Sequence, residues 1–216
     1  MSARKKSPTT PLTRERIVGT ALSLVDREGL KTLSMRRLGL ELGVDPMAVY
    51  YHIPNKGALL DAIVEAVMAE IDLTLDDPSD PAEERILCAA RAYRDALLAH
   101  TNALPIVLSR GPSTPVAMRP VELLIGILRD AGLPPSQAMA GMNAIAATVR
   151  GTIAMVAGES VALPTDVELR QLAEQYPADE FPHVREAAMC PADFISEDFD
   201  FGVRALARGL LGSVTT

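Results

Sequence analysis

Residues 33–61 read LSMRRLGLELGVDPMAVYYHIPNKGALLD, a pattern typical of two short helices joined by a tight turn. Ser34 is suited to cap the first helix. Gly43 can end it, because glycine readily adopts the left-handed conformation found after a helix. Asp45 can cap the second helix, with Pro46 in its first position. This spacing predicts a helix-turn-helix, a motif whose second helix fits the major groove of DNA.

Helical periodicity continues on both sides of this motif. Apolar residues recur at helical spacing after Thr13 and stop before Gly29, and a longer helix is expected to begin at Pro54 or Asn55. No convincing alternating pattern of a β-strand occurs, so the predicted fold class is all-α. Further helices are predicted near residues 82–100, 103–109, 115–131, 135–158, 166–176 and 192–213.

The chain divides into three predicted parts. A disordered basic tail is expected at residues 1–12, a three-helix DNA-binding domain at 13–58, and a larger helical domain at 59–216. The segment 163–200 is acidic and interrupted by prolines, so the pattern does not fix the helix ends there.

Charge is distributed unevenly along the chain. Residues 1–56 hold ten lysine and arginine residues against five acidic ones, a net charge of +5, although the whole chain carries −7. The remaining residues hold 11 basic against 23 acidic residues, a net charge of −12. A polyanion such as DNA would therefore be attracted to the N-terminal end only.

Several functional classes find no support in the sequence. Cys88 and Cys190 are too few for a disulfide framework and have no ligand partners at metal-binding spacing, so no metal or cofactor is expected. His52, His100 and His183 have no nucleophile or acid–base partner at motif spacing, which argues against an enzyme. No signal peptide or membrane span is expected, and these features predict a soluble cytoplasmic protein.

The helix-turn-helix and its flanks resemble the DNA-binding domain of the TetR (tetracycline repressor) family over residues 13–71. The similarity is greatest to the branch that contains the tetracycline repressor, since His52 follows two aromatic residues and Asn-Lys-x-Ala-Leu-Leu-Asp comes next. The resemblance implies a homodimeric transcriptional repressor that binds a palindromic operator and releases it when a small molecule enters its C-terminal domain.

The resemblance also implies which side chains face the DNA. Tyr50 and Lys56 would hold phosphates, together with backbone N–H groups at the start of the helix capped by Ser34. Arg36, with Arg37 beside it, would contact a guanine. The exposed face of the recognition helix would consist of Pro46, Met47, Ala48, Tyr51 and His52.

Two of these positions depart from the family branch. Pro46 and Met47 replace a hydrogen-bonding amide and a proline, so the operator sequence of that branch is not assumed for this chain. Apolar contact with a thymine methyl is expected at Met47 or Ala48. Simpler interpretations stay open: the two arginines could form a solvated face, His52 could cap or pack, and the tyrosines could belong to the core.

The resemblance is weaker beyond residue 81 but persists in Tyr93–His100 and Phe199–Leu211. It implies that helices 135–158 and 192–213 pack against a second protomer as a four-helix bundle. Small residues would allow close approach of these helices, although they also occur in monomeric cores; they are Gly141, Ala144, Gly151, Ala154, Gly202, Ala205 and Gly209.

A small-molecule effector would lie between the fourth helix and the helices near 82–158. The metal-binding histidine of the tetracycline-binding branch falls on Val107, so a metal-free, more hydrophobic ligand is expected here. The same residues could be ordinary core, because methionines often fill gaps. The predicted lining is Tyr93, Leu97, His100, Leu104, Val107, Leu123, Met139, Met142 and Asn143.

Two alternatives to a repressor remain open at this stage. The first is a DNA-binding activator with the same architecture, and the second is a protein-binding adaptor that kept the fold and lost its affinity for DNA. The presence of Arg36, Tyr50 and Lys56 speaks against the adaptor.

Overall fold

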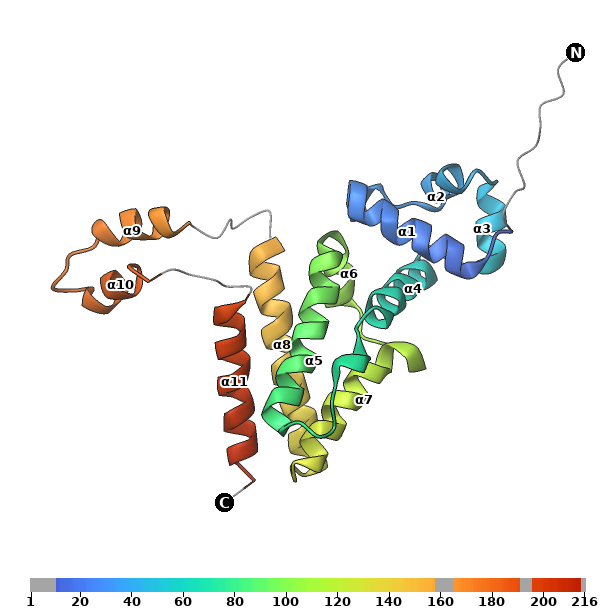
Figure 1. Cartoon of the computed structure of the whole chain (residues 1–216). Helices are drawn as coiled ribbons and strands as arrows, with labels where there is room; N and C mark the ends of the chain where they lie inside the picture. Colours follow the sequence, from blue (N-terminus) through green and yellow to red (C-terminus); the bar gives the residue numbers. More distant parts are fainter. Residues whose placement is uncertain (1–10, 158–164, 191–195, 215–216) are drawn as a thin grey trace, which may run out of the picture. The chain divides into compact units, whose positions relative to one another are not determined.

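The computed structural model describes residues 11–157, 165–190 and 196–214, and every regular element within these ranges is a helix (Figure 1). The predicted all-α fold is therefore confirmed. The chain forms two compact units, the first from Met1–Glu70 with Asn102–Ala117 and the second from Ile71–Thr101 with Met118–Thr216. Residues 1–10 of the predicted basic tail lie outside the described ranges.

The first unit contains the predicted helix-turn-helix. Its helices are α1 (Arg14–Glu28), α2 (Met35–Leu42), α3 (Pro46–His52), α4 (Lys56–Ala69) and α6 (Leu104–Ser109). Short 3₁₀ turns, Leu30–Thr32 and Thr101–Ala103, precede α2 and α6. Both α4 and α6 extend this unit beyond residue 58, at which the sequence pattern placed the end of the DNA-binding domain.

Side-chain caps begin α1, α2, α3 and α4 where the sequence pattern placed them, whereas α6 begins without a side-chain cap. The Thr13 hydroxyl accepts a hydrogen bond from the Arg16 amide at 3.2 Å, and the Asn55 side chain accepts one from the Ala58 amide at 2.9 Å. Each cap satisfies one of the amides that the first turn of a helix leaves without a partner. These local bonds explain why the helix starts were readable from the sequence.

The turn between α2 and α3 depends on two glycines. Gly43 ends α2 with φ of +69°, a left-handed conformation that other residues adopt only at a cost. At Gly39 a Cβ atom would meet the Val44 carbonyl oxygen at 3.1 Å and the Pro46 side chain at 3.2 Å. A side chain at this position would therefore make the turn between α2 and α3 shift by a few tenths of an ångström.

Apolar side chains from the helices of the helix-turn-helix form the core of the first unit. Leu38 of α2 and Val49 of α3 are fully buried, as predicted from the helical spacing. An ion pair between Arg14 and Glu65, at 3.0 Å, also links α1 to α4. Other fully buried members of the core are Ile17, Leu24, Leu59 and Ile63.

Three long helices form the centre of the second unit. They are α5 (Ala82–Ala99), α8 (Pro135–Ala157) and α11 (Glu197–Gly212), and each contacts the other two. Ion pairs add to their apolar packing, because Arg204 of α11 pairs with Glu83 at 3.2 Å and Arg91 of α5 pairs with Asp200. The helix α7 (Pro115–Asp130) precedes α8, and most of its residues belong to this unit.

Two short helices lie in the segment whose helix ends the sequence pattern left undetermined. The predicted helix over 166–176 is α9 (Asp166–Glu174), which begins with a capping box between Thr165 and Glu168. The six-residue α10 (Pro182–Ala187) was not predicted. The predicted helix over 192–213 corresponds to α11, although residues 191–195 lie outside the described ranges.

The helix α8 has 23 residues and, by length and composition, is apolar enough to cross a membrane. Such a helix was not expected from the sequence. The core helix of a soluble protein passes the same test. Ile145, Val149 and Ile153 of α8 are buried, and the helix packs against α5 and α11. This packing buries 33% of the apolar window.

Candidate nucleic-acid interface

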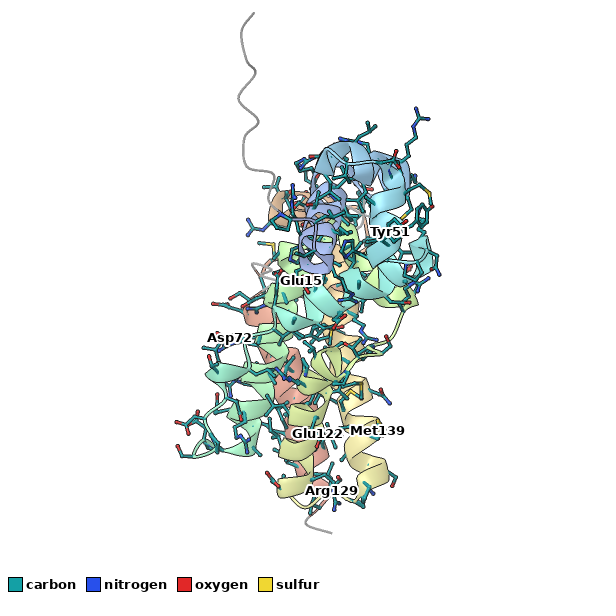
Figure 2. The ribbon with its side chains drawn as sticks, turned by 90° about the vertical axis from the view of Figure 1, so that its right-hand side faces the viewer. Glu15, Tyr51, Asp72, Glu122, Arg129 and Met139 are labelled. Carbon is teal, nitrogen blue, oxygen red and sulfur yellow. The ribbon has the colours of Figure 1, made fainter. Side chains whose placement is uncertain are left out.

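The outer face of α3 carries large exposed side chains. Tyr51 is 90% exposed and Met47 is 64% exposed, whereas Val49 on the opposite side is buried (Figure 2, where Tyr51 is labelled). Tyr50 is 40% exposed, and His52 is also exposed. A short helix that holds aromatic and apolar groups in solvent is suited to contact a partner surface. All predicted contact residues of α3 thus lie outside the core, Pro46 and Ala48 being half-buried.

The side chain of Arg36 on α2 is exposed, and the described part of the chain offers it no hydrogen bond or ion pair. An arginine without a carboxylate keeps all five N–H donors available for a guanine edge or a phosphate. The N–H donors of Arg36 are therefore available for the predicted contact with a guanine.

Arg37, by contrast, lies in an ion-pair network. Its guanidinium contacts Glu28 at 2.7 Å and Glu41 at 2.8 Å, and Arg27 also pairs with Glu41, at 2.9 Å. Hydrogen bonds from Arg27 and Arg37 lower the pKa of the Glu41 carboxyl. Because two carboxylates occupy the Arg37 guanidinium, this residue joins the end of α1 to α2 and is poorly placed to contact DNA directly.

Lys56, predicted to hold a phosphate, donates a hydrogen bond from Nζ to the carbonyl oxygen of Leu33 at 2.7 Å. Leu33 directly precedes Ser34, whose hydroxyl accepts a hydrogen bond from the Arg37 amide at 3.1 Å and so caps α2. An ammonium group has three N–H donors, so two remain for a phosphate. Lys56 thus links the start of α4 to the start of α2. This link brings together two predicted phosphate-binding groups, the Lys56 ammonium and the first amides of α2.

Sequence reasoning missed two groups in this unit. Arg110, which follows α6, pairs with Asp61 of α4 and donates to the Gly57 carbonyl at 3.3 Å. Leu40 of α2 is 69% exposed, one helical turn from Arg36. Neither had a local signal, because the Arg110 contacts join residues about fifty positions apart and Leu40 continues an apolar pattern.

The predicted effector residues are distributed over both units. Leu104 and Val107 belong to the first unit and are buried. The other seven belong to the second unit, in which Tyr93 and Leu97 are buried, whereas Met139 and Asn143 are exposed (Figure 2 labels Met139). His100, Leu123 and Met142 are half-buried. No group of three potential metal ligands occurs among the described residues.

Two family models match this chain. The model described as tetracyclin repressor-like, C-terminal domain, matches residues 76–213, and that of the tetR family of bacterial regulatory proteins matches residues 17–63. The chain belongs to the TetR family. Membership confirms the resemblance inferred from the sequence and the prediction of a ligand-responsive transcriptional repressor.

Individual relatives agree with this TetR-family assignment. An HTH-type transcriptional regulator of Saccharopolyspora erythraea is 31% identical over 212 residues, which cover 95% of this chain and 88% of the relative. The structure of apo ActR from Streptomyces coelicolor is 30% identical with a TM-score of 0.83, covering 95% of this chain and 98% of ActR. ActR has also been solved with actinorhodin.

A DNA complex is also among the similar structures. BioQ with its double-stranded DNA operator is 27% identical to this TetR-family chain, with a TM-score of 0.65, covering 94% of this chain and 99% of BioQ. The fold of this chain is thus shared with a protein that binds operator DNA.

Proposed function

We propose that this chain acts in the cytoplasm as a homodimer that holds a palindromic operator with α2 and α3 and dissociates when a small effector binds. One observation carries the proposal: two kinds of DNA-contacting group occur on the same motif. The outer face of α3 exposes Tyr51 and Met47, and Arg36 of α2 has no partner among the described residues. Apolar groups and an available guanidinium match the methyl and acceptor groups of a major groove.

The side chains divide into two roles. Arg36 reads a guanine, and Met47 or Ala48 contacts a thymine methyl, so these residues set sequence preference. Tyr50, Lys56 and the amides at the start of α2 hold phosphates and fix the register of the protein on DNA. Arg37 supports α2 through Glu28 and Glu41 and is not proposed as a direct contact. The remaining contact residues are Ser34, Pro46, Tyr51 and His52.

Dimerisation is proposed through α8 and α11. The small residues Gly151 and Ala205 are exposed, and so are the large apolar side chains of Met155, at 53%, and Phe201, at 76%. Apolar and small groups exposed on long helices favour a second protomer as the partner. Gly141 is not part of this surface, since a Cβ there would meet Leu128 and Leu210 of the same chain at 3.2 Å.

Release of DNA requires that the effector prefers the conformation that does not bind the operator, because equal affinity for both would shift nothing. Helix α4 is the proposed lever. It carries Lys56 at its start, and its Asp61 pairs with Arg110, so movement of the α6 end would reach α4 and change the position of α2 and α3.

The decisive experiment measures binding of the purified full chain to DNA from upstream of its own gene and to a scrambled duplex, over a series of salt concentrations. Tight, salt-dependent binding to the first duplex alone, at two protomers or a multiple of two per palindrome, is expected. Equally weak binding to both duplexes would contradict operator recognition there and would favour an adaptor.

A further inference from the structure

Arg150 lies in the second half of α8, and its side chain meets a tyrosine of α5. Its Nε donates a hydrogen bond to the Tyr93 hydroxyl at 2.8 Å, and its guanidinium carbon is 5.8 Å from the centre of the Tyr93 ring. Tyr93 is only 9% exposed, and Arg150 is half-buried. The Tyr93 hydroxyl and ring therefore orient the Arg150 guanidinium where α8 contacts α5.

Arg150 differs from the arginines of α5 and α11, the helices that pack against α8, because it has no acidic partner among the described residues. Arg85 pairs with Asp76 at 2.8 Å, Arg91 pairs with Asp200, and Arg208 pairs with Glu83 at 2.9 Å. No carboxylate in residues 11–157, 165–190 or 196–214 comes within ion-pair distance of Arg150. A partly desolvated cation is costly without a counter-charge, so its retention needs a reason.

Arg150 and Tyr93 together have more hydrogen-bond donors than acceptors. Of the five N–H groups of the Arg150 guanidinium, only that on Nε has a described partner, and the Tyr93 hydroxyl accepts that bond with its own O–H still free to donate. A carboxylate supplies two oxygens at the spacing of the guanidinium N–H groups and accepts several hydrogen bonds. The arrangement is complementary to an oxyanion.

Apolar residues lie one helical turn from each member of this pair. Leu97 follows Tyr93 by four residues on α5, and Ala146 and Ile153 lie one turn from Arg150 on either side along α8. Leu97 and Ile153 are fully buried, and the small side chain of Ala146 is half-buried. Leu97 and Ile153 are covered by the packing of this chain, so a ligand whose charged group binds Arg150 would reach their hydrocarbon surface only by opening the contact between α5 and α8.

We infer that the effector is an amphipathic organic anion, an apolar molecule with one oxyanion group such as a carboxylate, and that Arg150 and Tyr93 bind this group. The inference rests on the proposed function, since it assigns the chemical class of the effector. It adds one acidic group to the hydrophobic, metal-free ligand expected from the sequence.

Two fluorescent probes that differ in charge test the inference with the purified full chain. One is 8-anilino-1-naphthalenesulfonate, an apolar anion, and the other is N-phenyl-1-naphthylamine, which has the same rings without the sulfonate. Titrations compare the wild type with Arg150→Met, Arg150→Lys and Tyr93→Phe. The control is Arg119→Met, which removes an exposed arginine of α7 that has no described ion pair.

The wild type is expected to prefer the anionic probe. Arg150→Met should weaken its binding about tenfold or more, as expected for a hydrogen-bonded charge, with the uncharged probe unaffected. Arg150→Lys should retain part of the preference, and Arg119→Met should retain all of it. Equal wild-type affinity for both probes would overturn the inference, even if Arg150→Met failed to fold.

Loss of the dimer in Arg150→Met would also overturn it, because the counter-charge would then come from a second protomer. Operator binding by the same preparations separates this inference from the proposed function. A wild type that binds the operator but does not prefer the anionic probe contradicts only the class of the effector. A wild type that prefers the anionic probe but binds no operator contradicts only the repressor.

Discussion

Arg110 and Asp61 form an ion pair that joins the residue after α6 to the second turn of α4. Arg110 also donates a hydrogen bond to the Gly57 carbonyl at 3.3 Å, so one guanidinium holds two successive turns of α4. Since α4 carries Lys56 and packs on α1, this pair fixes the helix on which the position of the DNA-binding motif depends.

Breaking this pair should affect DNA binding more than stability. The Arg110 and Asp61 side chains are 32% and 48% exposed, so Asp61→Asn should change the free energy of unfolding by less than about 1 kcal/mol. Operator affinity should fall about fivefold, the lower end of typical coupling between sites, because α4 loses its fixed position. Fluorescence anisotropy with labelled operator and thermal melts measure the two effects.

The charge-swapped pair provides the control for this prediction. Asp61→Arg combined with Arg110→Asp should restore most of the operator affinity that each single change removes. If the single variants bind the operator as tightly as the wild type, the pair does not position α4.

Arg36→Ala should relax sequence preference at one position of the operator. A bidentate arginine–guanine contact contributes about 1–3 kcal/mol of discrimination, and no described partner of Arg36 is lost with it. Binding to a panel of operators with single base changes measures the effect, with thermal melts as a check of stability. Uniform weakening across the panel would instead place Arg36 on a phosphate.

Lys56→Ala should weaken binding to all duplexes alike. Loss of one phosphate contact is expected to reduce the slope of log affinity against log salt by about one. The variant also loses the hydrogen bond to the Leu33 carbonyl, so a stability decrease of about 1 kcal/mol is expected. Lys56→Arg keeps the charge and serves as the control. An unchanged salt slope in Lys56→Ala would show that the ammonium group only supports α2.

The parts of the fold that the sequence predicted are those specified by local interactions. Ser34, Asp45 and Gly43 act within a few residues of themselves, so their spacing was sufficient to place α2, α3 and the turn. The helix α10 escaped prediction, because six residues are too few to show an apolar period.

The contacts that the sequence could not predict join distant residues. The pairing of Arg150 with Tyr93 spans 57 positions, and a single charge on an apolar helix gives no sign of its partner. Arg37 is an intermediate case. Its pairing with Glu41 has the i,i+4 spacing and could have been predicted, whereas Glu28 lies on another helix. Gly141 was assigned to a dimer interface because the sequence does not show that Leu128 and Leu210 cover it.

Acid should weaken the junction of α1 and α2 through Glu41. Hydrogen bonds from Arg27 and then Arg37 lower the pKa of this carboxyl in the folded chain below its usual 4.5. The stabilisation is therefore complete above the unfolded-state pKa and is lost as pH falls through the lower folded-state value. We expect Glu41→Gln to melt below the wild type at pH 7, with the difference shrinking once the pH falls below about 4.5.

The matched control is Glu122→Gln, which changes an exposed glutamate of α7 that has no ion pair among the described residues (labelled in Figure 2). Its melting temperature should follow that of the wild type at every pH. Other carboxylates paired with arginine, such as Glu83, contribute to acid unfolding equally in wild type and Glu41→Gln, and so cancel in the difference. The prediction is wrong if the difference in melting temperature between wild type and Glu41→Gln stays constant from pH 7 to pH 3. A constant difference would mean that glutamine packs less well than glutamate and that the Glu41 charge does not stabilise the motif.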